Sequence, residues 1–485
     1  MPPALRNSRR CIVTQALPKT MDRFFNPQVF VKEKDRVGQP LPDAKEALGN
    51  LFRIAWPSMC ESFLIALVSL ADTIMVGVEG SAAIAAVGLT NQPRFIVLAL
   101  FMSLNVGITA VVSRRRGEND RESANRTLRQ SLLLITLASL LLSTLAFFFA
   151  RPLLNFAGAQ PDTIDDATGY FQILMVGTVL NTLMMAINAA QRGVGNTKLS
   201  FRTNLAANLV NIVFNYLLIG GNFGFPHMGV RGAAVATVLG YVAGFLIALC
   251  SVLPKDGFLH LSFRETWLPD KRNMSSLLNV GASAAVEQVF MRIGFFIFAK
   301  IIADLGTTAF ATHQICMSLI NISFAVGDGM AQATSSLVGQ NLGRDRPDLS
   351  TAYGHLAQRV GLSLGMLVVA FFILFRRYLI MPFSSEPEII ALGSNIIIIM
   401  ALMVPGQISQ VIFSNCLRVA GDTVYVAVTS LISITFLRPF SGWLFCTPLH
   451  LGLVGAWMGF FLDQYTRLLL NATRFKKGKW RHIKL

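Results

Sequence analysis

The sequence predicts an all-α membrane protein with twelve transmembrane helices in two pseudo-symmetric six-helix lobes. Its 485 residues are 53% apolar and only 14% charged, and the mean hydropathy is +0.54. Apolar stretches that are long enough to cross roughly 30 Å of hydrocarbon as helices recur at short intervals. The first half of the chain also echoes the second. This composition excludes a soluble enzyme, and the lack of period-two alternation disfavours an outer-membrane barrel.

The internal repeat holds a constant offset of 226 residues, without a gap, between residues 80–197 and 306–423. The motif Arg192-x-x-Gly195-x-Thr197 returns as Arg418-x-x-Gly421-x-Thr423. Other matched pairs are Gly80 with Gly306, Ala83 with Ala309, Ala85 with Ala311, Val112 with Val338 and Gly117 with Gly343. A duplicated bundle in so apolar a chain predicts a secondary transporter with its pathway between the halves. Because six-helix repeats keep their orientation, an axis along the membrane normal should relate the lobes.

The predicted spans define the order of the domains. They lie near 51–77, 86–113, 130–150, 166–190, 200–220, 230–253, 276–303, 309–337, 357–378, 388–413, 424–446 and 451–472. We therefore expect a basic N-terminal tail (1–48), a first lobe (49–253), a cytoplasmic linker (254–275), a second lobe (276–472) and a basic C-terminal tail (473–485).

The net charge of +16 follows the predicted topology. The two tails and the even-numbered loops, with their flanking residues, hold 31 Lys and Arg, whereas the odd-numbered loops hold four: Arg151, Arg231, Arg376 and Arg377. This asymmetry is the positive-inside rule and places both termini in the cytoplasm. We expect a multi-pass monomer in the plasma (inner) membrane, surrounded by lipid, that binds no nucleic acid.

The first 50 residues are basic and lack the apolar core of a secretory signal, so they predict a solvated tail. An organelle-targeting segment is the alternative, because Arg6, Arg9, Arg10 and Lys19 precede the first acid, Asp22. Met21 is an alternative start.

The six cysteines and six histidines are scattered and form neither a CxxC pair nor an HExxH motif. The sequence therefore predicts no zinc site, no cofactor and no intramembrane metalloprotease. We expect a protein that is not an enzyme. A channel is an alternative from another class, and a counter-flow assay would separate it from a transporter, because a channel does not show saturable exchange.

Asp72, deep in the first span, is the best candidate for ion coupling. A charged group in a span is costly and marks a functional site by default. The repeat equivalent of Asp72 is Phe298, so the architecture does not require an acid there. A carboxylate in low dielectric can carry a proton near neutrality or bind a hard cation such as Na⁺. The alternative is a carboxylate that caps backbone near the interface.

Four asparagines lie along one face of the fifth span, at spacings of three and four. They are Asn204, Asn208, Asn211 and Asn215. Thr237 of the sixth span would complete a polar pocket with them, next to Asp72. Amides on one side of a membrane helix also hold helices together, so that structural alternative stays open.

Glu61 and Glu287 are repeat equivalents near the starts of the first and seventh spans, which favours a symmetric gate or a helix-end salt bridge. Their candidate partners are Arg53, Arg292, Arg344 and Arg359. Asp328, between Gly327 and Gly329 in the eighth span, is a weaker functional candidate. Asp463 and Arg467, four residues apart, are expected to pair. Arg438 is expected to extend its side chain toward the membrane interface.

The 36 Phe and 18 Met, against 5 Trp and 7 Tyr, suit a large and tolerant cavity. Single Phe and Met residues mostly pack or face lipid. Thioethers and aromatic faces are nevertheless what a site for flat organic cations uses. We expect Met75, Met291, Gln314 and Gln407 to line such a cavity.

From about residue 48 to the C-terminus, the chain resembles the multidrug and toxic compound extrusion (MATE) transporters. The motifs that carry the resemblance are Ala55-Trp56-Pro57-Ser58, Asp72-Thr73-Ile74-Met75-Val76-Gly77, Ala83-x-Ala85-Ala86-Val87-Gly88, Arg192-Gly193-Val194-Gly195-Asn196-Thr197, Gly229-Val230-Arg231-Gly232-Ala233-Ala234-x-Ala236-Thr237, Leu337-Val338-Gly339-Gln340-Asn341-Leu342-Gly343 and Arg418-Val419-Ala420-Gly421-Asp422-Thr423. Their order and spacing are highly specific.

The resemblance implies export of amphipathic, often cationic organic compounds in exchange for inward H⁺ or Na⁺. It gives Asp72 the role of the essential first-helix acid, with Asn211, Asn215 and Thr237 at the same site. The places of the further carboxylates of the NorM-type branch hold Met291 and Gln407 here, so the chain looks closer to the DinF-like branch, where coupling is confined to the first lobe. A lipid-linked oligosaccharide flippase of the same superfamily is the alternative, and it would need a more cationic lumen.

Overall fold

The computed structural model describes residues 24–37, 40–77, 81–157, 161, 163–262, 264–268, 270–384 and 386–483. Every regular element within these ranges is helical, which confirms the predicted fold class. The first lobe consists of α2 (Ala44–Gly77), α3 (Ser81–Gly117), α4 (Arg121–Phe148), α5 (Ala150–Phe156), α6 (Ile164–Gly193), α7 (Thr197–Ile219) and α8 (Gly229–Cys250).

The second lobe repeats this order. It consists of α9 (Lys271–Ala303), α10 (Thr307–Gly343), α11 (Pro347–Phe375), α12 (Pro387–Val419), the continuous segment α13 (Thr423–Ser430), η4 (Leu431–Leu437) and α14 (Arg438–Cys446), and α15 (Gly452–Lys477). The η4 stretch is π-helical. Short 3-10 turns are η1 (Pro27–Val29), η2 (Glu33–Asp35), η3 (Asn222–Gly224) and η5 (Lys479–His482). Eight of the described helical segments are long and apolar enough to cross a membrane.

The helix ends follow the repeat. Gly195 and Gly421 occupy equivalent turns, after α6 and α12, and both have left-handed backbones with φ of +89° and +95°. A side chain there would strain the backbone, which is why each copy keeps glycine. These turns send α7 and α13 back across the lobe, so that the motif containing each glycine ends one helix and starts the next.

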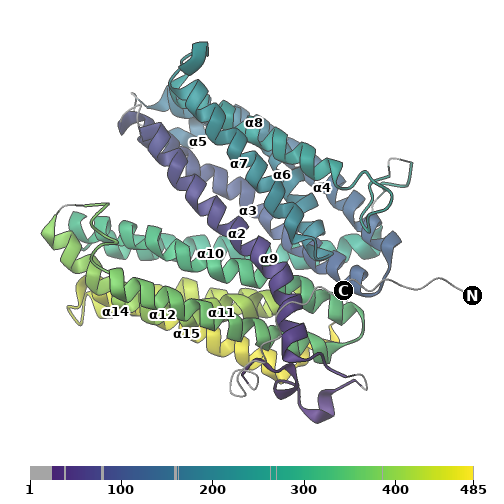
Figure 1. The fold of residues 1–485 in the computed structure, drawn as a ribbon. Coiled ribbons are helices and arrows are strands. Elements are labelled where there is room, and N and C mark those ends of the chain that lie inside the picture. The colour runs from purple at the N-terminus through teal and green to yellow at the C-terminus, as the bar shows by residue number, and fades with distance from the viewer. Residues whose placement is uncertain are drawn as a thin grey trace, which may run out of the picture.

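The two lobes converge near the C-terminus and diverge toward the opposite end (Figure 1). At the converging end, α2 packs against α10, α9 packs against α3, and α3 crosses α10. Because α2 and α9 are repeat equivalents, as are α3 and α10, the interface is self-complementary. It is the contact that a two-fold axis between the lobes generates.

Glycines allow the backbones of α3 and α10 to approach each other closely where the two helices cross. A methyl group added to Gly117 would overlap the carbonyl oxygen of Gln340, and one added to Gly343 would overlap that of Arg114. The two contacts are reciprocal, because Gly117 matches Gly343 and Arg114 matches Gln340 at the offset of 226. Gln340 also donates to the Gly193 carbonyl oxygen at 2.9 Å. These contacts hold the lobes together at the end where the C-terminus lies.

The prediction of a solvated N-terminal tail is wrong for residues 24–37. The guanidinium of Arg359 lies over the rings of Phe24 and Phe30, at 4.6 and 4.4 Å from their centroids. Val31 is buried against Leu41 and Ala352. Apolar side chains and cation–π contacts therefore attach this segment to the second lobe. Residues 1–23, with the predicted targeting segment and Met21, lie outside the described residues.

Candidate functional site: an inter-lobe cavity flanked by two repeated ion pairs

A cavity of about 460 Å³ lies between the lobes. The first lobe contributes side chains of α3 and α6, and the second contributes α9, α10, α12 and α15. The wall mixes apolar and amide side chains with four charged ones: Arg192, Asp328, Arg418 and Arg467. A cavity lined by both apolar and polar side chains suits an amphipathic organic molecule better than a bare ion.

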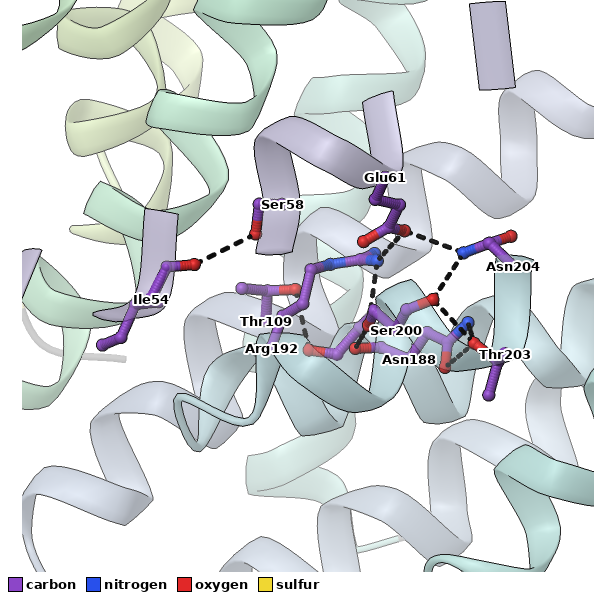
Figure 2. A network of polar contacts seen from close by, with 10 residues as sticks. Ile54, Ser58, Glu61, Thr109, Asn188, Arg192, Ser200, Thr203 and Asn204 are labelled. Carbon is purple, nitrogen blue, oxygen red and sulfur yellow. Dashed lines mark hydrogen bonds and ion pairs between the residues drawn. The ribbon is translucent and has the colours of Figure 1, made fainter. Parts of the chain in front are cut away.

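Glu61 lies at one flank of this cavity, in the network that Figure 2 shows. It projects from α2 and is 4% exposed. Arg192, at the end of α6, donates one hydrogen bond to Glu61 Oε1 at 3.4 Å, and Asn204 of α7 donates another to the same oxygen at 2.8 Å. The second oxygen, Oε2, has no hydrogen-bond partner within the described part of the protein.

Glu287 of α9 occupies the equivalent place in the second lobe and is 3% exposed. Arg418 donates to Oε2 at 3.1 Å and to Oε1 at 2.6 Å, and Ser430 donates to Oε1 at 2.7 Å. Each member of this triad matches a member of the first, Glu61, Arg192 or Asn204, at the offset of 226. The repeat has thus preserved a complete ion-pair network, not only its acid.

The arginines that the sequence suggested as partners of these acids do not bind them in the described structure. Arg292 lies over the ring of Phe95, and Arg359 binds the N-terminal segment instead. The suggestion failed because it chose arginines near the acids along the chain or near helix ends. The true partners, Arg192 and Arg418, are each 131 residues away from their acids.

Three residues of the predicted ion site, Asn211, Asn215 and Thr237, form a chain of hydrogen bonds inside the first lobe. Asn215 of α7 donates to Asn211 Oδ1 at 3.3 Å, and Asn211 donates to Thr237 Oγ1 of α8 at 3.1 Å. Both asparagines are buried, whereas Asn208 is half-buried. Asp72 belongs to α2, which packs against α7 and α8, but its side chain lies outside the described residues.

The second lobe has a different chemistry at the equivalent place. Phe298 and Phe460 stand where the first lobe has Asp72 and Thr237, and their rings lie 6.2 Å apart. The Arg438 guanidinium lies 3.9 Å from the Phe460 centroid and 5.9 Å from that of Phe298. Asp463 accepts from Arg438 at 2.5 and 3.2 Å. A tethered cation therefore fills this region of the second lobe.

Arg438 corrects one prediction, and Asp463 confirms another. Arg438 does not extend toward the interface, because it is 1% exposed and held by aromatic rings and by Asp463. The prediction failed because the π-helical stretch just before Arg438 is not visible in the sequence. The predicted pair of Asp463 with Arg467 is present, with contacts of 3.1 and 3.0 Å.

The residues predicted to line a substrate cavity lie in different places. Met291 lines the inter-lobe cavity. Met75 packs against the core of the first lobe, and Gln314 is exposed on α10. Gln407 is fully buried and accepts a hydrogen bond from Ser323 at 2.6 Å. Sequence reasoning missed Asn105 and Gln332, both of which line the cavity. Their signal was an isolated amide in an apolar span.

Two repeated helical lobes around a cavity with apolar and polar walls form the architecture of a membrane transporter. The MatE family model matches residues 57–217 and 283–444. The chain therefore belongs to the MatE family of transporters.

Curated relatives match almost the whole chain. The uncharacterized transporter YisQ of Bacillus subtilis is 29% identical over 89% of this chain and 94% of its own length. The probable multidrug resistance protein NorM of Thermotoga maritima is 28% identical over 91% of this chain and 95% of its own length.

Solved structures share the fold. An outward-facing multidrug resistance MATE family transporter superposes with a TM-score of 0.83 at 22% identity, over 89% of this chain and 96% of its own. A mutant of the MATE transporter VcmN of Vibrio cholerae superposes with a TM-score of 0.83 at 18% identity, over 89% and 97%.

Proposed function

We propose that this protein is a secondary antiporter that exports amphipathic, often cationic organic compounds in exchange for inward H⁺ or Na⁺. The observation that carries the proposal is the difference between the lobes. The first has a buried chain of amide and hydroxyl groups beside the helix of Asp72, whereas a fixed guanidinium fills the equivalent region of the second. The names of NorM and other multidrug resistance relatives support the export of drug-like compounds.

The coupling step takes place at Asp72, with Asn211, Asn215 and Thr237 as the neighbouring oxygen ligands or hydrogen-bond partners. Binding of a proton or of Na⁺ neutralises the carboxylate in a low-dielectric lobe. Neutralisation lets α2 repack, and Pro57 within this helix interrupts its hydrogen-bond ladder and allows it to bend. Because α2 also packs against α10, its bending biases the equilibrium between the two arrangements of the lobes.

The positive-inside asymmetry assigns the end with the C-terminus to the cytoplasm. The lobes are joined at that end, so the described arrangement corresponds to the outward-facing state of a plasma membrane transporter that acts as a monomer. Confinement of coupling to the first lobe agrees with the DinF-like branch. The ion pairs of Glu61 and Glu287 then serve as a matched pair of helix anchors near the cytoplasmic closure.

The proposal is tested with purified protein in liposomes, where efflux of the cation ethidium is driven by a pH gradient or by a Na⁺ gradient, each imposed alone. We expect one gradient to drive efflux in the wild type and Asp72→Asn to abolish it, with unchanged insertion and thermal stability. Asp304→Asn is the matched control, because Asp304 is an exposed acid just after α9. Full gradient-driven efflux by Asp72→Asn would reject the coupling scheme.

A lipid-linked oligosaccharide flippase is favoured by one feature only, the three arginines of the cavity. Each of them already binds a carboxylate: Arg192 with Glu61, Arg418 with Glu287, and Arg467 with Asp463. A pyrophosphate would have to displace these acids. Flipping of a fluorescent pyrophosphate lipid in the same liposomes, without any ion gradient, would favour this alternative.

A further inference from the structure

We propose that Asp328 of α10 is the anchor for the cationic group of the transported compound in the inter-lobe cavity. Its carboxylate lines the cavity and is exposed to it. Among the charged side chains that the structure describes there, Asp328 is the one with neither a hydrogen bond nor an ion pair. This inference rests on the proposed export of organic cations and names the residue that selects them.

Each of the three arginines that line the cavity is already bound to a carboxylate, which leaves Asp328 as the charged group available to a ligand. Arg192 and Arg418 are neutralised by Glu61 and Glu287. Asp463 binds both Arg467 and Arg438. Arg438 is not among the residues that line the cavity, and its guanidinium lies over the rings of Phe460 and Phe295 at 3.9 and 4.6 Å. The Asp328 carboxylate makes no hydrogen bond or ion pair within the described protein, and Arg418, whose charge acts on it across the cavity, is already bound to Glu287. A carboxylate without an ion-pair partner in a mostly apolar enclosure is costly unless a cation neutralises it.

Amide groups without partners show that the cavity is built for a ligand. Asn105 of α3, in the other lobe, is 6% exposed and lines the same cavity. Neither its amide nitrogen nor its amide oxygen has a hydrogen-bond partner within the described protein. Gln332, one helical turn after Asp328, also lines the cavity, and its amide oxygen has no partner there. Buried amides are normally satisfied, so a ligand or water completes these.

The apolar part of the wall supplies the rest of the binding energy. Met102 comes from the first lobe, and Met291 and Phe324 come from the second. Thioether and aromatic side chains adapt to flat or bulky hydrocarbon groups. Gly329, the neighbour of Asp328, lies so close to Met59 of α2 that a methyl group would come within 2.6 Å of the Met59 Cα. The anchor is therefore tied to an inter-lobe contact, so that lobe movement changes its surroundings.

The test compares two probes of nearly the same shape and opposite charge, tetraphenylphosphonium and tetraphenylborate. Their binding is measured by isothermal titration with the purified full chain in detergent. We expect the wild type to prefer the phosphonium. Asp328→Asn should weaken phosphonium binding roughly tenfold to a hundredfold, the range for losing a charged partner, and should not weaken borate binding. Asp328→Glu should restore part of the affinity, and Asp304→Asn should change nothing.

A second binding measurement tests the role of the Asn105 side-chain amide. Ethidium carries amino groups that donate hydrogen bonds, whereas the phosphonium has none. Asn105→Leu should weaken ethidium binding and leave phosphonium binding unchanged; equal effects on both would overturn the role of Asn105.

Asp328 is rejected as the anchor if Asp328→Asn affects both charged probes equally or neither of them. It is rejected too if the wild type prefers the borate or binds neither probe. Thermal unfolding of each variant shows whether it is folded. The test needs no ion gradient, so charge-selective binding without driven efflux would reject the antiport while leaving the anchor in place.

Discussion

Arg418 binds the Glu287 carboxylate through two nitrogens, at 2.6 and 3.1 Å, in an ion pair of which the carboxylate is almost completely buried. The repeated pair in the first lobe is looser, because Arg192 reaches Glu61 through one contact of 3.4 Å. The repeated ion pair is therefore tighter in the second lobe than in the first. The stronger copy is in the lobe whose interior is fixed by Arg438, and the weaker one is in the lobe that we propose to couple to the ion.

The difference between the two pairs predicts unequal losses of stability. Arg418→Met should lower the free energy of unfolding by about 3–5 kcal/mol, because it leaves Glu287 buried without its cation. Arg192→Met should cost less, because a single longer contact is lost and Asn204 still donates to Glu61. Thermal unfolding in detergent measures both. The double variant Glu287→Gln/Arg418→Met should recover part of the loss, and equal losses in the two single variants would contradict the ranking.

The fold was predictable because two signals, hydropathy and the internal repeat, are written along the chain. The partners of Glu61 and Glu287 were also encoded, since Arg192 and Arg418 keep the same offset as the acids. That signal becomes useful only when both members of a pair are compared across the repeat. Distance along the chain is a poor guide, because residues 131 positions apart meet when α6 and α12 return to the same end of their lobes.

Other features of the site could not be read from residue patterns. The orientation of Arg438 depends on a π-helical stretch that changes the helix register just before it. The cavity amides Asn105 and Gln332 are single polar residues, and hydropathy averages over them. The packing of residues 24–37 depends on a cation–π contact with Arg359, which is more than 300 residues away. Each is a consequence of tertiary packing.

The glycine crossing of α3 and α10 predicts a shift between states. Gly117→Val should clash with α10, and overpacking of this kind costs about 1–3 kcal/mol. If the lobes relieve the clash by separating at this end, the ratio of molecules with separated lobes to molecules with joined lobes rises roughly 5- to 150-fold. Spin labels on the exposed residues Lys198 and Arg344, in a background without native cysteines, would report a longer distance.

Two further variants check that interpretation. Gly343→Val, the reciprocal change, should act in the same direction. Gly49→Val is the matched control, because an added side chain on this exposed helical glycine meets nothing within 4 Å. An unchanged distance distribution in both Gly117→Val and Gly343→Val would show that this contact does not hold the lobes together.

The polar chain in the first lobe predicts a ranking among its asparagines. Asn211→Leu removes the donor to Thr237 and the acceptor for Asn215, so it should raise the concentration of coupling ion needed for half-maximal efflux roughly tenfold, by analogy with the loss of a supporting ligand at a metal site. Asn208→Leu is the control on the same helix, because Asn208 is half-buried and outside this chain of hydrogen bonds. A larger effect for Asn208→Leu would instead assign coupling to the exposed side of α7.

The fixed guanidinium in the second lobe predicts one coupling ion per transport cycle. Arg438 lies between Phe298 and Phe460 and is bound by Asp463, so no second ion has room or a free carboxylate at the place equivalent to the proposed site. Exchange of one monovalent organic cation for one H⁺ or Na⁺ moves no net charge. Ethidium accumulation in liposomes should therefore not respond to a K⁺ diffusion potential set with valinomycin. Two ions per cycle would add about 2.3 kcal/mol at 100 mV, about fiftyfold in the accumulation ratio, and such a response would refute single-site coupling.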